Sequence, residues 1–471
     1  MINDNQPTAA ELDSAGITSI EAEAAPEPIA EQTFADFGIH PDIVAALEEK
    51  GIVHPFPIQA MTLPVALSGH DIIGQARTGT GKTLGFGVPL LSRVTAPGET
   101  SKAAVPAPEG KPQAMVVVPT RELAVQVASD LEAAAKKRGI RIAQIYGGRA
   151  FEPQVERLEK GVEVIVGTPG RIIDLATRGH LDLAYVGCLV LDEADEMLDL
   201  GFLPDIQRLW GALSQPLQTM LFSATMPAPI LKLAREMMNK PVHIRAESAD
   251  SSQLHDTTKQ VVFVSHKMDK PEVVARVLQA DGRGRTIIFT RTKRTAAEVA
   301  EDVARRGFAV GSVHGDLGQS ARERSLEAFR KGDVEILVAT DVAARGIDVD
   351  DVTHVINYQT PDDPMTYVHR IGRTGRAGRT GTAVTLVGFD ETGKWKIISD
   401  ELGLDMPEPP SWFSTSPELF DALSIPDDAK SSVGPAREVH GIPKRSGGEG
   451  QKQRSRSRSG SGSRSRSGRR R

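Results

Sequence analysis

The 471-residue sequence predicts an α/β protein with two tandem domains, each a mainly parallel sheet flanked by helices. Short apolar runs such as 115–118 and 188–191 alternate with amphipathic stretches such as 122–136. The alternation pauses at the polar residues 246–256 and restarts at 261–264. We therefore expect two units of the same architecture joined by a linker.

Composition shifts predict six segments. Residues 1–33 are acidic and aperiodic, and we expect them to be disordered. They are followed by a first domain (34–245, with a Pro-rich surface insertion at 95–113), a linker (246–257), a second domain (258–405), a Pro-rich extension (406–443) and a disordered Arg-Ser tail (444–471). The extension retains Trp412, Phe413, Leu419, Phe420 and Leu423, so both docking on the second domain and a linker role stay open.

The composition is that of a soluble globular protein, with 39% hydrophobic and 25% charged residues. Cys188 is the single cysteine, which excludes an intramolecular disulfide and a cysteine-only zinc site. It lies in an apolar run, where a small buried hydrophobic residue on a strand is the expectation. No apolar run approaches the roughly 18 residues that cross a bilayer. We expect a cytoplasmic protein without a membrane partner.

The net charge of −6 conceals an asymmetry. Residues 1–33 hold seven acidic residues and no Lys or Arg, whereas residues 444–471 hold eleven Lys or Arg and one acid, Glu449. Such a division suggests nucleic-acid contact. The tail is expected to add salt-sensitive affinity for phosphates; a merely solubilising role is the alternative.

Residues 76–83, Ala-Arg-Thr-Gly-Thr-Gly-Lys-Thr, predict a phosphate-binding loop. They follow a strand-like run and precede a helical one, so backbone N–H groups and a helix dipole would face a phosphate. Lys82 would supply a charge to the β and γ phosphates, and the Thr83 hydroxyl could ligate magnesium. The alternative is a glycine-rich turn that carries a lysine.

A second element is the acidic tetrad Asp192-Glu193-Ala194-Asp195, directly after the apolar run 188–191. Asp192 would hold magnesium, and Glu193 would orient and deprotonate a water. Carboxylates at a helix N-terminus are the alternative interpretation. Because ligands bind at the carboxyl ends of parallel strands, the tetrad and the loop are expected to meet.

These motifs resemble those of the DEAD-box helicases of superfamily 2, of the bacterial type, over residues 34 to about 390. The resemblance implies two tandem RecA-like domains with ATP and Mg²⁺ as cofactors. Residues 51–59 are similar to the family's Q motif, with Phe34 standing 17 residues before it and Gln59 reading adenine. The resemblance also assigns Thr78, Gly79, Thr80 and Gly81 to the nucleotide, and Ser223 and Thr225 to coupling hydrolysis with strand separation.

The resemblance further implies a track that binds the RNA backbone from both domains. Its residues in the first domain are Pro119, Thr120, Arg121, Gly147, Gly148, Thr168, Pro169, Gly170 and Arg171. Those in the second domain are Thr290, Arg291, Gln319, Arg322 and Thr340. Asp348 would face the ATP ribose, and His369, Arg373 and Arg376 the γ-phosphate, the two arginines as fingers. Hydrolysis would therefore require the domains to close.

The expected function is an ATP-dependent RNA helicase, an RNA-stimulated ATPase that locally unwinds short duplexes or remodels ribonucleoprotein. Aromatic residues are only 4% of the chain, which favours sequence-independent backbone contacts over base stacking. Ribosomal or RNA-decay proteins are compatible partners. The competing interpretations are a DNA helicase of the same superfamily and an ATP-gated RNA clamp. A small-molecule P-loop kinase would leave the second domain unexplained.

Overall fold

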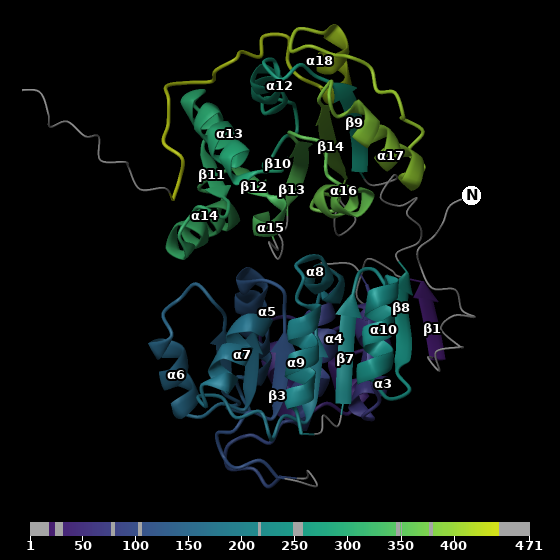
Figure 1. Cartoon of the computed structure of the whole chain (residues 1–471), viewed down its shortest axis with the longest axis vertical. Coiled ribbons are helices and arrows are strands. Elements are labelled where there is room, and N and C mark those ends of the chain that lie inside the picture. Colours follow the sequence, from purple (N-terminus) through teal and green to yellow (C-terminus); the bar gives the residue numbers. More distant parts are fainter. Residues whose placement is uncertain are drawn as a thin grey trace, which may run out of the picture.

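Two α/β domains make up the protein, one above the other in Figure 1, as the sequence predicts. The structure is a computed structural model. It describes residues 18–23, 32–76, 81–101, 106–214, 218–247, 258–344, 349, 351–375 and 380–441. All strand pairs of the two sheets in these residues are parallel. No helix of these residues is long and apolar enough to span a membrane.

The first domain contains an eight-stranded sheet. Its order is β1 (Thr18–Glu23), β8 (Val242–Glu247), β2 (Ile72–Gln75), β7 (Gln218–Ser223), β6 (Cys188–Leu191), β3 (Ala114–Val117), β5 (Val164–Gly167) and β4 (Ile142–Ile145). The central strands read as continuous apolar runs because helices cover both faces. Successive residues alternate between the faces: Cys188 and Val190 belong to one core cluster, Leu189 and Leu191 to the other.

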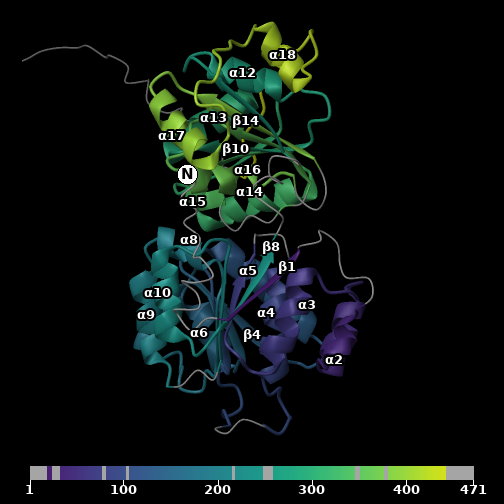
Figure 2. The ribbon, with the colours of Figure 1, turned by 90° about the vertical axis from the view of Figure 1, so that its right-hand side faces the viewer.

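Helices of the first domain form two layers, which Figure 2 shows on opposite sides of the sheet. One layer holds η1 (Phe34–Phe37), α2 (Pro41–Glu48), α3 (Pro57–Leu67), α4 (Lys82–Arg93) and α5 (Arg121–Ala135). The other holds α6 (Glu152–Glu159), α7 (Pro169–Thr177), α8 (Ala194–Asp199), α9 (Leu203–Ala212) and α10 (Ala228–Met237).

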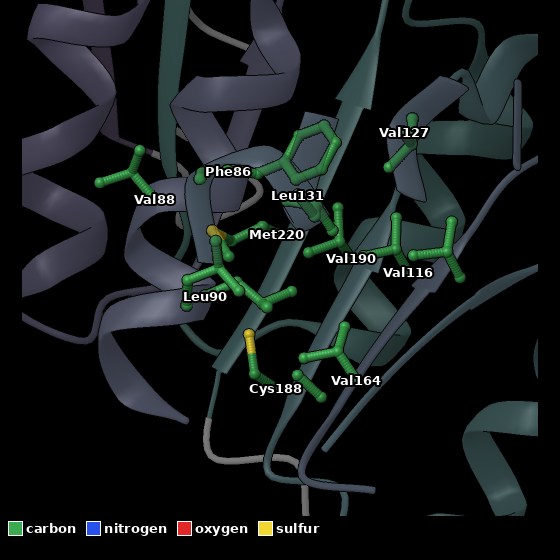
Figure 3. Close-up of a cluster of buried hydrophobic side chains, with 14 of the residues drawn as sticks. Phe86, Val88, Leu90, Val116, Val127, Leu131, Val164, Cys188, Val190 and Met220 are labelled. Carbon is green, nitrogen blue, oxygen red and sulfur yellow. The ribbon is translucent and has the colours of Figure 1, made fainter. Parts of the chain in front are cut away.

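Cys188 lies inside the first of these cores, near Leu90, Val164 and Val190 (Figure 3). It is 3% exposed, and burial raises the pKa of its thiol to about 12. The expectation of a small buried hydrophobic residue on a strand is confirmed.

The second domain contains a six-stranded sheet. Its order is β11 (Val310–Val313), β12 (Ile336–Thr340), β10 (Arg285–Thr290), β13 (Val352–Asn357), β14 (Gly381–Val387) and β9 (Thr258–Val264). One face packs against α12 (Lys270–Val277), α13 (Lys293–Arg305) and α18 (Pro417–Leu423). The other face packs against α14 (Gln319–Lys331), α15 (Asp341–Ala344), α16 (Pro364–Ile371) and α17 (Thr392–Leu402).

Two segments differ from or refine the sequence-based expectations. Residues 18–23 were expected to be disordered with the rest of 1–33, but they form β1, which pairs in parallel with β8. Edge pairing supplies backbone hydrogen bonds that composition does not reveal.

The extension is not a linker: it docks on the second domain as far as Gly441, with Leu419 fully buried. The predicted linker falls mostly on residues 248–257, outside the described residues, as does the tail.

Acidification is expected to destabilise both domains through His243 and His354. Burial lowers the pKa of each from 6.5 to about 4. As the pH falls, the unfolded chain therefore takes up these protons before the folded chain does. The contribution of the two histidines to the free energy of unfolding is fully present above pH 6.5 and is lost as the pH falls toward 4, by on the order of 2–3 kcal/mol for each histidine. Urea unfolding between these pH values measures the loss. His243→Gln and His354→Gln should each flatten the dependence; an unchanged slope in both contradicts the assignment.

Candidate functional site

The predicted motifs gather at one edge of the first sheet, where the parallel strands have their carboxyl ends. Ala76, the first residue of the predicted phosphate loop, follows β2, Ser223 ends β7, and the acidic tetrad follows β6. These three strands are neighbours in the sheet. The predicted RNA residues follow the next three, β3, β5 and β4. The edge thus carries the predicted nucleotide residues on one part, which we call the nucleotide half, and the predicted nucleic-acid residues on the other, which we call the nucleic-acid half. The two parts meet between β6 and β3.

Lys82 and Glu193 form a buried ion pair at the centre of the nucleotide half. Lys82 begins α4, Glu193 precedes α8, and Nζ lies 3.0 Å from Oε1. The two residues are 6% and 7% exposed. Burial opposes the charge on Lys82, but the carboxylates of Glu193 and Asp192 outweigh it and raise the pKa of Lys82. Glu193 adopts a left-handed backbone conformation, φ 53° and ψ 54°, which is rare for this residue and typical of functional sites.

Asp192 is suited to a hard cation. It is 3% exposed, and burial raises the pKa of its carboxyl group to about 7 despite Lys82. Its Oδ1 accepts the backbone N–H of Glu193 at 3.0 Å. The described residues contain no group of three or more His, Cys, Asp or Glu side chains that could hold a metal. A single carboxylate fits Mg²⁺, which usually keeps several waters and is bound with substrate phosphates.

Asp195 connects the tetrad to the next motif. Its Oδ2 accepts the backbone N–H and the hydroxyl of Thr225, both at 2.9 Å. The Ser223 hydroxyl accepts the N–H of Asp195 at 3.2 Å and donates to the Thr225 carbonyl at 2.7 Å. A movement of the tetrad would therefore be transmitted to Ser223 and Thr225.

Gln59 connects the Q motif to the phosphate loop. Its Oε1 accepts the N–H of Phe56, and its Nε2 donates to the carbonyl of Gly81, both at 2.8 Å. Gln59 is 1% exposed in this arrangement. Phe34 is also 1% exposed and packs in the core behind the motif. Its assignment to the nucleotide stays a prediction, and Thr78, Gly79, Thr80, Asp348 and Arg376 lie outside the described residues.

Arginines converge in the nucleic-acid half. Burial and the nearby guanidinium of Arg322 lower the pKa of Arg121, and Arg171 adds to the effect. Arg171 Nη1 and Arg322 Nε are buried and donate no hydrogen bond within the described residues. Buried charged donors without acceptors are costly. An anion such as a phosphate would satisfy them.

Three contacts cross from this half to α14 of the second domain. Arg121 Nη1 donates to Gln319 Oε1 at 3.2 Å, and Arg322 Nη2 lies 3.0 Å from Glu122 Oε1. Arg149 Nη2 donates to Glu323 at 2.5 Å. The structure thus brings together Arg121, Gln319 and Arg322, which the sequence predicts on the RNA side. Glu122, Arg149 and Glu323 were missed, although each adjoins a predicted residue.

Predicted residues of the second domain also lie at strand ends. Thr290 and Thr340 end the neighbouring strands β10 and β12. Arg291 is held by Glu391, with Nη2 2.7 Å from Oε1. Glu391 is 6% exposed. It was not predicted, because no motif in the neighbouring sequence indicates a buried partner for Arg291.

Arg370, also missed, organises the finger region. It is 1% exposed and donates to Asp341 from Nε at 2.5 Å and from Nη2 at 2.7 Å. It thereby fixes α16, which carries His369 and precedes Arg373. Figure 1 shows α16 and α15 on the side of the second domain that faces α8.

The fold is that of two RecA-like domains. The first carries a phosphate loop with an acidic strand end beside it, and the second carries arginines. This combination defines a class of nucleotide-dependent motor proteins. Family models agree: DEAD/DEAH box helicase matches residues 56–233, and helicase conserved C-terminal domain matches residues 269–378. A DEAD-box ATP-dependent RNA helicase CshA from Geobacillus kaustophilus is 45% identical over 77% of this chain and 75% of its own length. The chain belongs to the DEAD/DEAH box helicase family.

Solved structures agree with the fold. S. cerevisiae Dbp5 bound to RNA and ADP BeF3 is 30% identical with a TM-score of 0.68, covering 80% of this chain and 95% of Dbp5. Mss116p bound to ssRNA and AMP-PNP is 25% identical with a TM-score of 0.71, covering 86% and 85%. The prediction of two tandem RecA-like domains is confirmed.

Gly148→Ala is expected to displace Arg121. Gly148 has φ +78°, and a Cβ there would overlap the Arg121 guanidinium. We expect RNA affinity to fall roughly tenfold, the loss of one charge-assisted contact, with little change in ATPase without RNA. Gly211→Ala is the control, because nothing lies within 4 Å of a Cβ at that helical position. Equal RNA affinity of the two variants would contradict the role of Gly148.

Proposed function

We propose that this protein is an ATP-dependent RNA helicase that binds the RNA backbone and locally opens short duplexes or remodels ribonucleoprotein. The observation that carries the proposal is the Lys82–Glu193 pair at 3.0 Å. On the same edge lie two buried guanidinium atoms that find no acceptor among the described residues, Arg171 Nη1 of the first domain and Arg322 Nε of the second. A triphosphate and a polyanion would then bind the same edge.

Lys82 changes partner in the proposed cycle. It neutralises Glu193 in the described arrangement, and a triphosphate would draw its ammonium toward the β and γ phosphates. Glu193 is then free to orient and deprotonate a water. Arg373 and Arg376, brought by the second domain, would stabilise the charge that develops on the γ-phosphate.

Asp192 and the Thr83 hydroxyl would hold Mg²⁺, partly through water, and the cation would neutralise phosphate charge. Asp192 must be ionised for this role. Because burial raises its pKa to about 7, the cation would compete with a proton, and its affinity would rise as the pH passes through neutrality.

Both domains contribute to the proposed RNA track. Arg121, Arg171 and Arg322 would contact phosphates, and Thr290, Arg291 and Thr340 would extend the track across the second domain. A strand held by both domains in a bent shape would no longer fit a duplex, so neighbouring pairs would open. Phosphate release would reverse domain closure as a shift of populations.

The Gln59 motif and the acidic tetrad favour RNA over DNA through the family resemblance. Titration of the ATPase with single-stranded RNA and DNA of equal length distinguishes the two, and stimulation by DNA alone would contradict the proposal.

We place the activity in the cytoplasm, where ribosomal or RNA-decay proteins would be its partners. Affinity capture with and without RNase treatment tests that partner class.

Glu193→Gln is expected to lower the ATPase rate by about 10²–10⁴, the usual contribution of a general base. ATP binding should be retained and should tighten, because the amide no longer competes with phosphates for Lys82. Single-turnover hydrolysis and fluorescent-nucleotide titration measure the two effects. Lys82→Ala is the contrasting variant, in which binding itself is lost. Wild-type turnover of Glu193→Gln would remove Glu193 from the mechanism.

A further inference from the structure

Glu391 is a buried carboxylate at the place where the carboxyl ends of three adjacent strands meet. It lies in the turn between β14 and α17 and is 6% exposed. Strands β10, β13 and β14 are neighbours in the second sheet and run in parallel, so the residues that follow them gather at one edge. Glu391 lies beyond residues 269–378, which match the helicase C-terminal domain, and it belongs to none of the predicted motifs.

Both oxygens of this carboxylate are engaged, and they reach all three strand ends. Oε1 lies 2.7 Å from Nη2 of Arg291, which follows β10. In the loop after β13, the hydroxyl and the backbone N–H of Thr360 donate to Oε2 at 3.2 and 3.3 Å. The backbone N–H of Gly388, just after β14, also donates to Oε2, at 3.0 Å. Donors other than Arg291 therefore fix the carboxylate, which can in turn fix Arg291.

Lys270 places a second cation beside Glu391. Its Nζ lies 3.7 Å from Oε2 and donates to the carbonyls of Tyr358 at 2.9 Å and Leu386 at 2.7 Å. Burial lowers the pKa of Lys270 to about 8, although Glu391 opposes this shift. Loss of the Glu391 charge would lower the pKa of Lys270 further, so the lysine can release its proton and need not remain a buried charge without a counterion. A neutral residue at position 391 is therefore compatible with folding.

Arg291 is held on one side and accessible on the other. Its backbone N–H donates to Gln359 Oε1 at 3.1 Å. Its Nη1 lies 3.6 Å from Asp362, whose side chain is 67% exposed and has a second partner in Lys394 at 2.5 Å. An ion pair with an exposed carboxylate contributes little to stability. An RNA phosphate can therefore replace Asp362 at Nη1 while Glu391 keeps Nη2.

Two effects of Glu391 on a phosphate at Arg291 oppose each other. An arginine side chain that must first be ordered binds about two- to tenfold more weakly than one that is already held. Against this, the carboxylate offsets the positive charge that attracts the phosphate. Lys270 supplies a second positive charge beside the same carboxylate, so the group of two cations and one anion stays positive. The ordering of Arg291 is then the larger effect.

We propose that Glu391 is a positioning residue for RNA binding: it holds the Arg291 guanidinium through Nη2 and directs Nη1 to a backbone phosphate. This inference rests on the proposed helicase function. It adds a residue from the turn after β14 to the edge of the second domain that binds RNA. Glu391 touches no phosphate itself and acts through Arg291.

A double-mutant cycle tests whether Glu391 acts through Arg291. Glu391→Gln keeps an oxygen that accepts hydrogen bonds but removes the ion pair, and Arg291→Gln removes the guanidinium. We expect Glu391→Gln to weaken RNA affinity about two- to tenfold and to change it no further in the Arg291→Gln background. Titration of a labelled single-stranded RNA with the full chain, in the presence of a non-hydrolysable ATP analogue, measures the unchanged chain and the three variants.

Three results would overturn the proposal. An equal loss of affinity in both backgrounds would mean that Glu391 only stabilises the fold. A higher affinity of Glu391→Gln would mean that Glu391 opposes RNA binding by neutralising Arg291. The third concerns the matched control, Thr360→Val, which removes the hydroxyl 3.2 Å from the same carboxylate and leaves the Arg291 pair in place. Its RNA affinity should equal that of the unchanged chain, and a loss as large as that of Glu391→Gln would contradict the role of the pair.

The ATPase keeps failure of this inference apart from failure of the proposed function. In Glu391→Gln, the RNA concentration that gives half-maximal stimulation is expected to rise by the factor found for RNA affinity, rather than the KM for ATP. Absence of RNA stimulation in the unchanged chain would count against the proposed function. Normal stimulation of the unchanged chain, together with an additive double-mutant cycle, would count against the positioning role alone.

Discussion

The parallel arrangement of the first sheet is the constraint on which the site depends. Every strand ends at the same edge, so motifs separated by more than a hundred residues in sequence, such as Lys82 and Glu193, become neighbours without any long loop. Their order along the edge follows the strand order and not the chain order. The edge can therefore present a nucleotide half and a nucleic-acid half that share the boundary between β6 and β3.

Buried charge gives this edge its chemical character. Lys82, Asp192 and Glu193 form a group with little solvent contact, and burial raises the pKa of the Asp192 carboxyl group, so this part of the edge favours a compensating positive charge. The opposite imbalance holds around Arg121, where burial and the neighbouring guanidinium groups lower the pKa of the Arg121 side chain. One half thus favours cations and the other anions. The pairs between Arg121 and Gln319 and between Glu122 and Arg322 connect the second half to the other domain.

The sequence predicted the two domains, the strand-end placement of the motifs and the core position of Cys188, because apolar runs buried on both faces and glycine-rich turns are local signals. It did not predict β1, whose partner β8 lies more than two hundred residues away. Arg370 and Glu391 were missed for a related reason: their burial results from the meeting of strand ends and helices, and arginine and glutamate are usually exposed. The docking of the extension was left open because its apolar residues are few and widely spaced.

The pairing of β1 with β8 and of β9 with β14 has a consequence for biosynthesis. Neither sheet can be completed locally, since Thr18 pairs with Val242 and Thr258 pairs with Gly381. During translation the first domain can close once residue 247 has left the ribosome, before most of the second domain exists. Until then β8 is missing and β2 remains an open edge. Non-local parallel pairing of this kind folds slowly, so the nascent chain passes through a period in which β2 is open to association with other chains.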